Sequence, residues 1–202
     1  MKINYDIKYS EQISSISGKP KLLLHCCCGP CSSASLEKLE KNFEITIVFY
    51  NPNIFPYEEY EKRLNEQKKL LKIAFPNINI LDVDYNENEF LTKITGLENE
   101  KEGGARCSVC FALRLEKTAI LAKEKKFDYF GTTLTISPHK NEQIINQIGE
   151  KLSQKFGIAF LYCDLKKHDG YKRSIELSKK YNIYRQDYCG CRFSVRGETV
   201  GI

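Results

Sequence analysis

The chain has 202 residues, of which 42% are hydrophobic and 28% are charged, and its net charge is +5. This composition excludes a disordered or fibrous protein and is typical of one compact domain with a full core, here residues 1–202. The mild positive excess permits a polyanionic partner such as RNA without requiring one. No apolar run reaches the roughly 18 residues that cross a bilayer, so no membrane association is expected.

The N-terminal segment lacks the apolar stretch of a secretory signal, which predicts a cytoplasmic protein whose thiols stay reduced. Nine cysteines, an odd number, argue against a disulfide framework in such a protein. Metal binding or thiol redox chemistry is therefore the expected use of these cysteines.

Strand and helix patterns alternate about five times along the chain. In chain order the sequence predicts an N-terminal extension (1–20), a strand (21–26), a helix (32–41), a strand (44–50), a helix after Pro56, a strand (78–83), a long acidic loop (84–106), a helix (108–125), a strand (128–135), a helix from about 141 to a C-cap at Gly157, a strand (158–163), a helix (171–181) and a cysteine-bearing tail (183–202). This alternation is typical of an α/β fold with a mostly parallel, doubly wound sheet.

Candidate functional residues follow the carboxyl ends of several predicted strands. Open parallel sheets bind ligands at the carboxyl ends of their strands, so these residues are expected along one edge of the sheet. They are Cys27, Cys28 and Cys31, then Asn51 and Asn53, then Cys107 and Cys110, then Thr132, Thr133, Ser137, His139 and Lys140, and on the tail Tyr188, Cys189 and Cys191. Cys26 and Cys163 fall within predicted strands and are expected in the core, because free cysteine is among the most buried residues. Seven cysteines remain as site candidates.

Three kinds of thiol site fit part of this pattern. Cys28-Gly-Pro-Cys31 repeats the thioredoxin tetrad, but the chain has no tryptophan and that class does not require the other cysteine pairs. The two C-x-x-C pairs stand much further apart than the roughly 15–20 residues of a zinc ribbon. An iron–sulfur cluster takes four thiolates, and seven thiols leave a surplus for a second metal or a redox-active pair. The residues alone favour the iron–sulfur site and leave the other two open.

Longer motifs carry a family resemblance. The segments LLLHCCCGPC, FYNPNIFPYEEYEKR, GGARCSVCFALRLEKTA, FGTTLTISPHKNEQIINQIGE and IYRQDYCGCRFS occur in this order between Lys21 and Ser194. In this order they resemble the epoxyqueuosine reductases of the QueH type. The resemblance covers nearly the whole chain.

The resemblance implies an oxidoreductase that acts on tRNA. It would reduce the epoxide of epoxyqueuosine at the wobble position to give queuosine and water, the last step of queuosine synthesis. The family resemblance also implies a fold similar to the adenine nucleotide alpha hydrolases, a 4Fe–4S cluster and an additional mononuclear iron. An external one-electron donor such as ferredoxin or flavodoxin is expected as a partner.

Site residues follow from the same resemblance. Cys27 and Cys28, Cys107 and Cys110, and Cys189 and Cys191 match cysteine pairs of the family, and all are expected as metal ligands. Cys31 stands where some members carry aspartate, which makes it a candidate ligand of the additional iron. His139 and Tyr188 are candidate catalytic residues, and the expected substrate contacts are Asn51, Asn53, Thr132, Thr133, Ser137 and Lys140.

Two further expectations concern partners and alternatives. A basic group near the C-terminal part of the chain is expected either to be a solvated helix face or to contact tRNA phosphates. Its members are Lys166, Lys167, Lys172, Arg173, Lys179 and Lys180.

The alternative function is a thiol–disulfide or zinc-binding protein that uses Cys28 and Cys31 without RNA chemistry.

Overall fold

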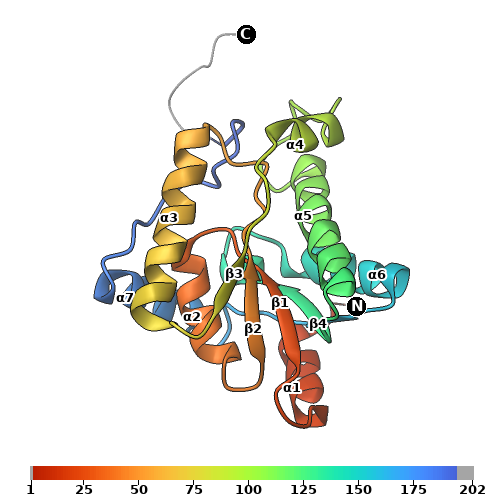
Figure 1. Ribbon diagram of the computed structural model, residues 1–202. Helices are drawn as coiled ribbons and strands as arrows, with labels where there is room; N and C mark the ends of the chain where they lie inside the picture. The colour runs from red at the N-terminus through yellow and green to blue at the C-terminus, as the bar shows by residue number, and fades with distance from the viewer. Residues whose placement is uncertain (1, 195–202) are drawn as a thin grey trace.

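A five-stranded parallel sheet forms the centre of residues 2–194, the part of the chain that this computed structural model describes. Its strands are β1 (Lys21–His25), β2 (Glu44–Val48), β3 (Asn79–Leu81), β4 (Tyr129–Thr132) and β5 (Ala159–Phe160). They run in the order β3-β2-β1-β4-β5, and every pair is parallel (Figure 1). The prediction of a parallel, doubly wound α/β sheet is confirmed.

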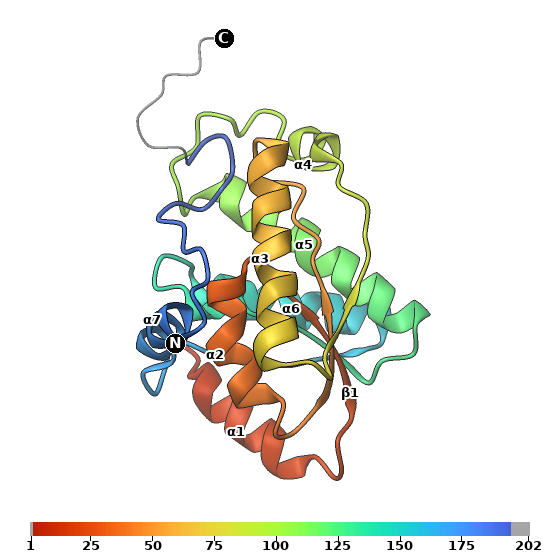
Figure 2. The same ribbon diagram turned by 60° about the vertical axis from the view of Figure 1, so that its left-hand side comes forward.

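Helices cover both faces of this sheet. On one face lie α2 (Gly29–Leu39), α3 (Tyr57–Ala74) and α7 (Gly170–Lys180) (Figure 1 and Figure 2). On the other face lie α5 (Ala105–Glu124) and α6 (Glu142–Phe156). The remaining elements are α1 (Tyr5–Ser15), the short α4 (Glu87–Lys93) and a 3-10 turn, η1 (Leu134–Ile136). No helix in residues 2–194 has the length and apolar character that a membrane span requires.

β1 is apolar along most of its length because both of its faces are covered. Leu22 and Leu24 pack on the side of α2 and α3, whereas Leu23 packs on the side of α5 and α6. Cys26 and Cys163 are buried in the same cluster as Leu22 and Leu24, as predicted. The two-sided core therefore explains the continuous LLL run.

The order of the strands reverses between β1 and β4. The connections from β1 lead to β2 and β3 on one side, and the chain then returns to place β4 on the other side of β1. In open α/β sheets such a switch point leaves a crevice at the carboxyl ends of the two strands. The loop after β1 and the segment after β4 therefore meet at this edge.

One segment prediction is wrong, and a second segment contains a helix that the sequence patterns do not predict. Residues 84–106 are not one continuous loop, because α4 forms within them: Asn86 accepts a hydrogen bond from the Asn88 N–H at 3.1 Å, and Phe90 is buried. The extension at residues 1–20 contains α1, which the sequence patterns do not predict and which Asn4 caps. Both helices begin with a capping asparagine followed by acidic residues, so this local signal is present in the sequence.

Several boundaries also differ from the prediction. The strands are shorter than expected, and α2 begins at Gly29, which places Cys31 in its first turn. α5 begins at Ala105, so Cys107 and Cys110 lie within the helix. Gly157 is the C-cap of α6, with φ 65°, as predicted. Residues 195–202 of the expected tail lie outside the described residues.

Candidate metal centre

Three cysteine side chains converge directly after β1. The Sγ atoms of Cys27, Cys28 and Cys31 lie within 4.8 Å of one another, and those of Cys27 and Cys28 are 3.8 Å apart. Cys28 has an extended backbone and stands at the N-cap of α2, whose first turn carries Pro30. The tight passage from β1 into α2 therefore gathers three thiols in one cluster.

This donor set fits a thiophilic metal. Thiolates bound about 2.3 Å from a tetrahedral metal ion stand about 3.8 Å apart, and the Sγ atoms of Cys27 and Cys28 have this separation. Sulfur donors favour zinc, copper(I) and iron–sulfur clusters over magnesium or calcium. Cys189 lines the same cavity as Cys27 and Cys31, which brings a fourth thiol to the site. The residues present therefore fit a metal centre with four thiolate ligands.

The thiols differ in how readily they lose a proton. Hydrogen bonds from Cys28 and Cys31 lower the pKa of Cys27 well below its usual value, although burial opposes the shift. Contact with Cys27 raises the pKa of Cys28 to about 11 and that of Cys31 well above its usual value. A hydrogen bond from Cys191 lowers the pKa of Cys189 to about 5. Cys27 and Cys189 are therefore the thiols best prepared to bind a metal as thiolates.

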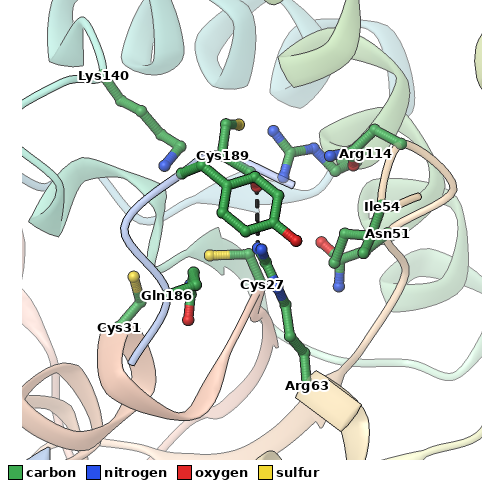
Figure 3. Close-up of a pocket in the computed structure, with 11 residues that line it drawn as sticks. Cys27, Cys31, Asn51, Ile54, Arg63, Arg114, Lys140, Gln186 and Cys189 are labelled. Atoms are coloured by element: carbon green, nitrogen blue, oxygen red, sulfur yellow. Dashed lines mark hydrogen bonds between the residues drawn. The ribbon is translucent and has the colours of Figure 1, made fainter. Parts of the chain in front are cut away.

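A small cavity of about 30 Å³ adjoins the thiol cluster (Figure 3). Residues from distant parts of the sequence line it: Cys27, Cys31, Asn51, Asn53, Ile54, Arg63, Arg114, Lys140, Gln186, Tyr188 and Cys189. The side chains of Asn51, Asn53, Arg63 and Arg114 are almost fully buried there. Each has a fully buried polar atom without a hydrogen-bond partner among the described residues, Oδ1 in the asparagines and Nη2 in the arginines. These atoms are available to a ligand.

Arg63 connects α3 to the C-terminal tail. Its Nε donates to Glu59 Oε1 at 2.6 Å, and its Nη1 donates to the carbonyl oxygen of Cys189 at 2.9 Å. The Phe55 N–H donates to the Gly190 carbonyl oxygen at 2.8 Å. These contacts hold Cys189 at the cavity beside the thiols that follow β1.

A larger cavity of about 620 Å³ adjoins the first. The two share Cys31, Lys140, Gln186, Tyr188 and Cys189 in their linings. The larger one is further lined by Cys107 and Phe111 of α5, by Ser137, His139 and Asn141 before α6, by Tyr171 and Ser174 of α7, and by Arg185 and Asp187 of the tail. Cavities of about 300–1,000 Å³ commonly hold small-molecule ligands. A ligand in this cavity would reach the thiols at its inner wall.

The three remaining predicted metal ligands do not share one environment. Cys107 lines the larger cavity. Cys110 and Cys191 are buried together in an apolar cluster with Phe90 and Ile94 of the α4 region. α4 therefore covers two of the seven candidate cysteines.

Thr132 and Thr133 stand at the end of β4 but line neither of the two cavities. The Thr132 hydroxyl lies 3.0 Å from His25 Nδ1, and the opposite nitrogen of His25, Nε2, lies 3.1 Å from the Tyr50 carbonyl oxygen. Burial lowers the pKa of His25 to about 3, so the ring is neutral: Nε2–H donates to Tyr50, and Nδ1 accepts from Thr132. The hydrogen bond between His25 and Thr132 therefore connects β1 to β4 next to the thiol cluster.

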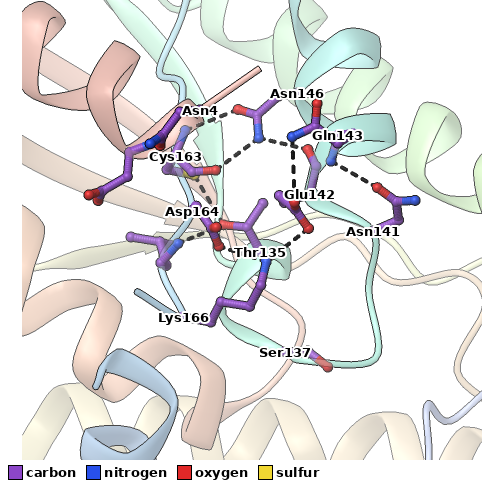
Figure 4. A network of polar contacts seen from close by, with 12 residues as sticks. Asn4, Thr135, Ser137, Asn141, Glu142, Gln143, Asn146, Cys163, Asp164 and Lys166 are labelled. Carbon is purple, nitrogen blue, oxygen red and sulfur yellow. Dashed lines mark hydrogen bonds and ion pairs between the residues drawn. The ribbon is translucent and has the colours of Figure 1, made fainter. Parts of the chain in front are cut away.

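A polar network holds the start of α6 against the segment that follows β5 (Figure 4). The Asn146 amide donates to the Cys163 carbonyl oxygen at 2.8 Å and accepts from the Cys163 N–H at 3.0 Å. Lys166 Nζ lies 2.9 Å from Glu142 and 2.7 Å from Asp164. These contacts fix the start of α6. Several of the residues that line the larger cavity lie in the segment directly before this helix.

Sequence reasoning misses four residues of the small cavity: Ile54, Arg63, Arg114 and Gln186. Glu59 and Arg63 are four residues apart on a helix, a spacing that normally indicates an exposed ion pair. For Arg114 a signal exists, because it follows Cys110 by four residues and so projects from the same face of α5. An arginine on the apolar face of an amphipathic helix indicates a buried charge with a specific role.

Comparison with known proteins confirms the family resemblance of the sequence motifs. The family model described as "Epoxyqueuosine reductase QueH" matches residues 22–197. A relative with this name from Streptococcus pyogenes serotype M1 is 41% identical, over 100% of this chain and 82% of its own length. Those from Staphylococcus epidermidis and Thermotoga maritima are 42% and 35% identical, over 98% and 86% of this chain and 87% and 90% of their own lengths. The chain therefore belongs to the epoxyqueuosine reductase QueH family.

Proposed function

We propose that this protein reduces the epoxide of epoxyqueuosine in tRNA, giving queuosine and water. Loss of the epoxide oxygen as water consumes two electrons and two protons. The observation that carries the proposal is that Cys31 and Cys189 lie in the shared lining of the two cavities. A modified nucleoside in the larger cavity would therefore meet the thiol cluster. The name of the family supports the same activity.

The proposed cofactors are a 4Fe–4S cluster and an additional iron. The proposed ligands are Cys27, Cys28, Cys31, Cys107, Cys110, Cys189 and Cys191. When bound, such a centre supplies single electrons, and an iron with an open position acts as a Lewis acid. The grouping of Cys27, Cys28 and Cys31 within 4.8 Å supports the assignment of these three.

The protein's own groups would bind the substrate and supply protons. Lys140 and Tyr188 line both cavities, so both lie beside any group that reaches the thiols. Burial alone would lower the pKa of Lys140, but the thiolates of Cys189 and Cys27 raise it above its usual value. Its Nζ therefore keeps three N–H donors for the departing oxygen. His139 lines the larger cavity and is the second proposed proton donor.

The remaining polar groups of the cavities would orient the substrate. Asn51 and Asn53 each present an unpaired, buried Oδ1 to the small cavity, and Ser137 lines the larger one. Amide oxygens accept hydrogen bonds from hydroxyl and ammonium groups. Thr132, also proposed from the sequence as a substrate contact, would act through His25 because its hydroxyl bonds to that ring.

The proposed partner is a tRNA whose wobble base is turned out into the larger cavity, since proteins usually read unstacked loop bases. Of the six basic residues singled out in the sequence, Lys166 and Arg173 are paired with carboxylates. The other four are free of ion pairs within the described residues and would contact phosphates: Lys167, Lys172, Lys179 and Lys180. A cytoplasmic ferredoxin or flavodoxin would supply the electrons.

The first test is the metal content of protein purified without oxygen, followed by turnover. About five irons and four acid-labile sulfides per chain are expected. Reduced protein should then convert tRNA-bound epoxyqueuosine to queuosine, as measured by mass spectrometry of the digested nucleosides. The Cys107→Ala variant is expected to lose turnover, whereas Cys163→Ala, which changes a core cysteine, should keep it.

Two results would contradict the proposal. Full turnover by Cys107→Ala would remove the proposed role of that thiol. Zinc alone, or metal-free protein with a reducible Cys28–Cys31 disulfide, would instead support the alternative of a thiol–disulfide or zinc protein.

A further inference from the structure

Arg114 is a buried cation without a carboxylate partner. Its side chain is 1% exposed, its Nε donates to the Cys110 carbonyl oxygen at 3.2 Å, and its Nη2 has no hydrogen-bond partner among the described residues. Within residues 2–194 no aspartate or glutamate forms an ion pair with it. A guanidinium cannot lose its proton in a protein, so this charge needs an anion close by.

Arg63, on the opposite side of the sheet, provides the comparison. It is 2% exposed and lines the same small cavity, but Glu59 balances its charge at 2.6 Å. The charge of Arg114 has no such partner. Lys140, which also lines the cavity, adds a further positive charge.

The groups near Arg114 that can carry a negative charge are the thiols of the candidate metal centre, which bind a metal as thiolates. Arg114 lines the small cavity together with Cys27, Cys31 and Cys189 (Figure 3). The charge that satisfies Arg114 is therefore that of the candidate metal centre.

We propose that Arg114 is the counter-cation of the thiolate-bound iron–sulfur centre and raises the reduction potential of that centre. This inference rests on the proposed presence of iron and sulfide in the protein. Four thiolates give a cluster a net negative charge, which becomes more negative on reduction. A fixed positive charge in a low-dielectric site stabilises the reduced form more than the oxidised form. Arg114 would thereby favour delivery of the first electron from a donor.

The experiment compares Arg114→Met with Arg114→Lys in iron-loaded protein. Both changes remove the Nε–H that bonds to Cys110, but only methionine removes the charge. Lys123→Met, in the exposed last turn of α5, removes one positive charge from the same helix away from the cavity and serves as the control. The midpoint potential is measured by a redox titration followed by electron paramagnetic resonance.

Arg114→Met is expected to lower the equilibrium constant for one-electron reduction by about tenfold, a shift of about 59 mV to lower potential. Arg114→Lys and Lys123→Met should stay close to the unmodified protein. An unchanged potential in Arg114→Met, or an equal shift in Arg114→Lys, would overturn the inference.

A second comparison applies if Arg114→Met does not hold iron. Arg114→Lys and Arg114→Gln are then reconstituted side by side, and iron is counted per folded chain. Iron retained with lysine and lost with glutamine supports a charge role, whereas equal iron in the two variants contradicts it. Absence of iron and sulfide from the unmodified protein would instead refute the proposed cofactor, so the two failures are distinguishable.

Discussion

Gly190 lies where the C-terminal tail packs against Arg63 of α3. Its φ of +103° belongs to a region that side chains other than glycine rarely adopt. A Cβ at this position would lie 2.7 Å from Arg63 Nη1. Arg63 has little freedom to move away, because Glu59 and the Cys189 carbonyl oxygen hold its guanidinium. Glycine is therefore required at this position for two reasons: its φ is positive, and a Cβ would collide with Arg63.

Gly190→Ala is expected to displace Cys189 from the cavity and lower the iron content of the protein. Backbone strain alone should cost about 1–3 kcal/mol of stability. The matched control is Gly18→Ala, because Gly18 also has a positive φ, of 72°, but a Cβ there meets no atom within 4 Å. The control should lose stability and keep its iron. Normal iron in Gly190→Ala, measured on folded protein, would contradict this account of the tail.

At the level of elements, the start of α6 is held by a carboxylate with two cationic partners. Glu142, the first residue of the helix, lies 2.9 Å from Lys166 and 3.3 Å from Lys2. Burial alone would raise the pKa of Glu142, but hydrogen bonds, chiefly that from Lys166, lower it to about 2. The N-terminal end of the helix dipole adds to this effect. The ion pair therefore stabilises the segment that presents Lys140 to the cavities.

Glu142→Gln should reduce the free energy of unfolding by about 1–2 kcal/mol at neutral pH, a value reduced for solvent screening. A lowered carboxylate pKa stabilises the fold above the unfolded-state value of about 4.3, and this contribution is lost as the pH falls through about 2. Denaturant unfolding at several pH values should show the two proteins converging over that range.

The control for this prediction is Glu116→Gln. Glu116 pairs with Lys155, whose side chain is 60% exposed, so its contribution to stability should be small. A constant difference between Glu142→Gln and the unmodified protein from pH 7 to pH 2 would show that the ionised carboxylate is not the source of the stabilisation.

On the scale of the whole molecule, α1 protects the β5 edge of the sheet. The Gln12 side chain donates to the Phe160 carbonyl oxygen at 2.8 Å and accepts from the Tyr162 N–H at 3.0 Å. Tyr5 of α1 stacks on Tyr162 with ring centroids 5.9 Å apart. The side chain of Gln12 thus takes the place that a sixth strand would occupy, and it satisfies backbone groups that would otherwise be open to another chain.

Gln12→Ala is therefore expected to destabilise the protein by about 1 kcal/mol and to speed hydrogen exchange at the Tyr162 amide. Urea unfolding and amide exchange measure the two effects. Gln154→Ala, which changes an exposed glutamine of α6, should alter neither. Unchanged exchange at Tyr162 in Gln12→Ala would contradict the edge-protecting role of α1.

The sequence by itself determined the features that depend on nearby residues. The LLL run of β1, the amphipathic face of α5 and the C-cap at Gly157 each express a local pattern. The adjacency of Cys27 and Cys28 is likewise a local pattern, and it indicates thiol chemistry without any knowledge of the fold. The sequence patterns do not predict α1 and α4, although capping asparagines mark both, because a cap is a weak signal without a strong apolar periodicity behind it.

The tertiary structure decided which distant groups share a space. Only the placement of β4 beside β1 brings Lys140 to the thiols, and only the return of the tail brings Cys189 there. The burial of Arg63 could not be foreseen, because arginine is normally exposed, and for Arg114 only its position on the apolar face of α5 hints at burial. Burial, ion pairing and cavity shape depend on contacts between residues far apart in the chain, whereas the patterns of single elements depend on neighbours within a few residues.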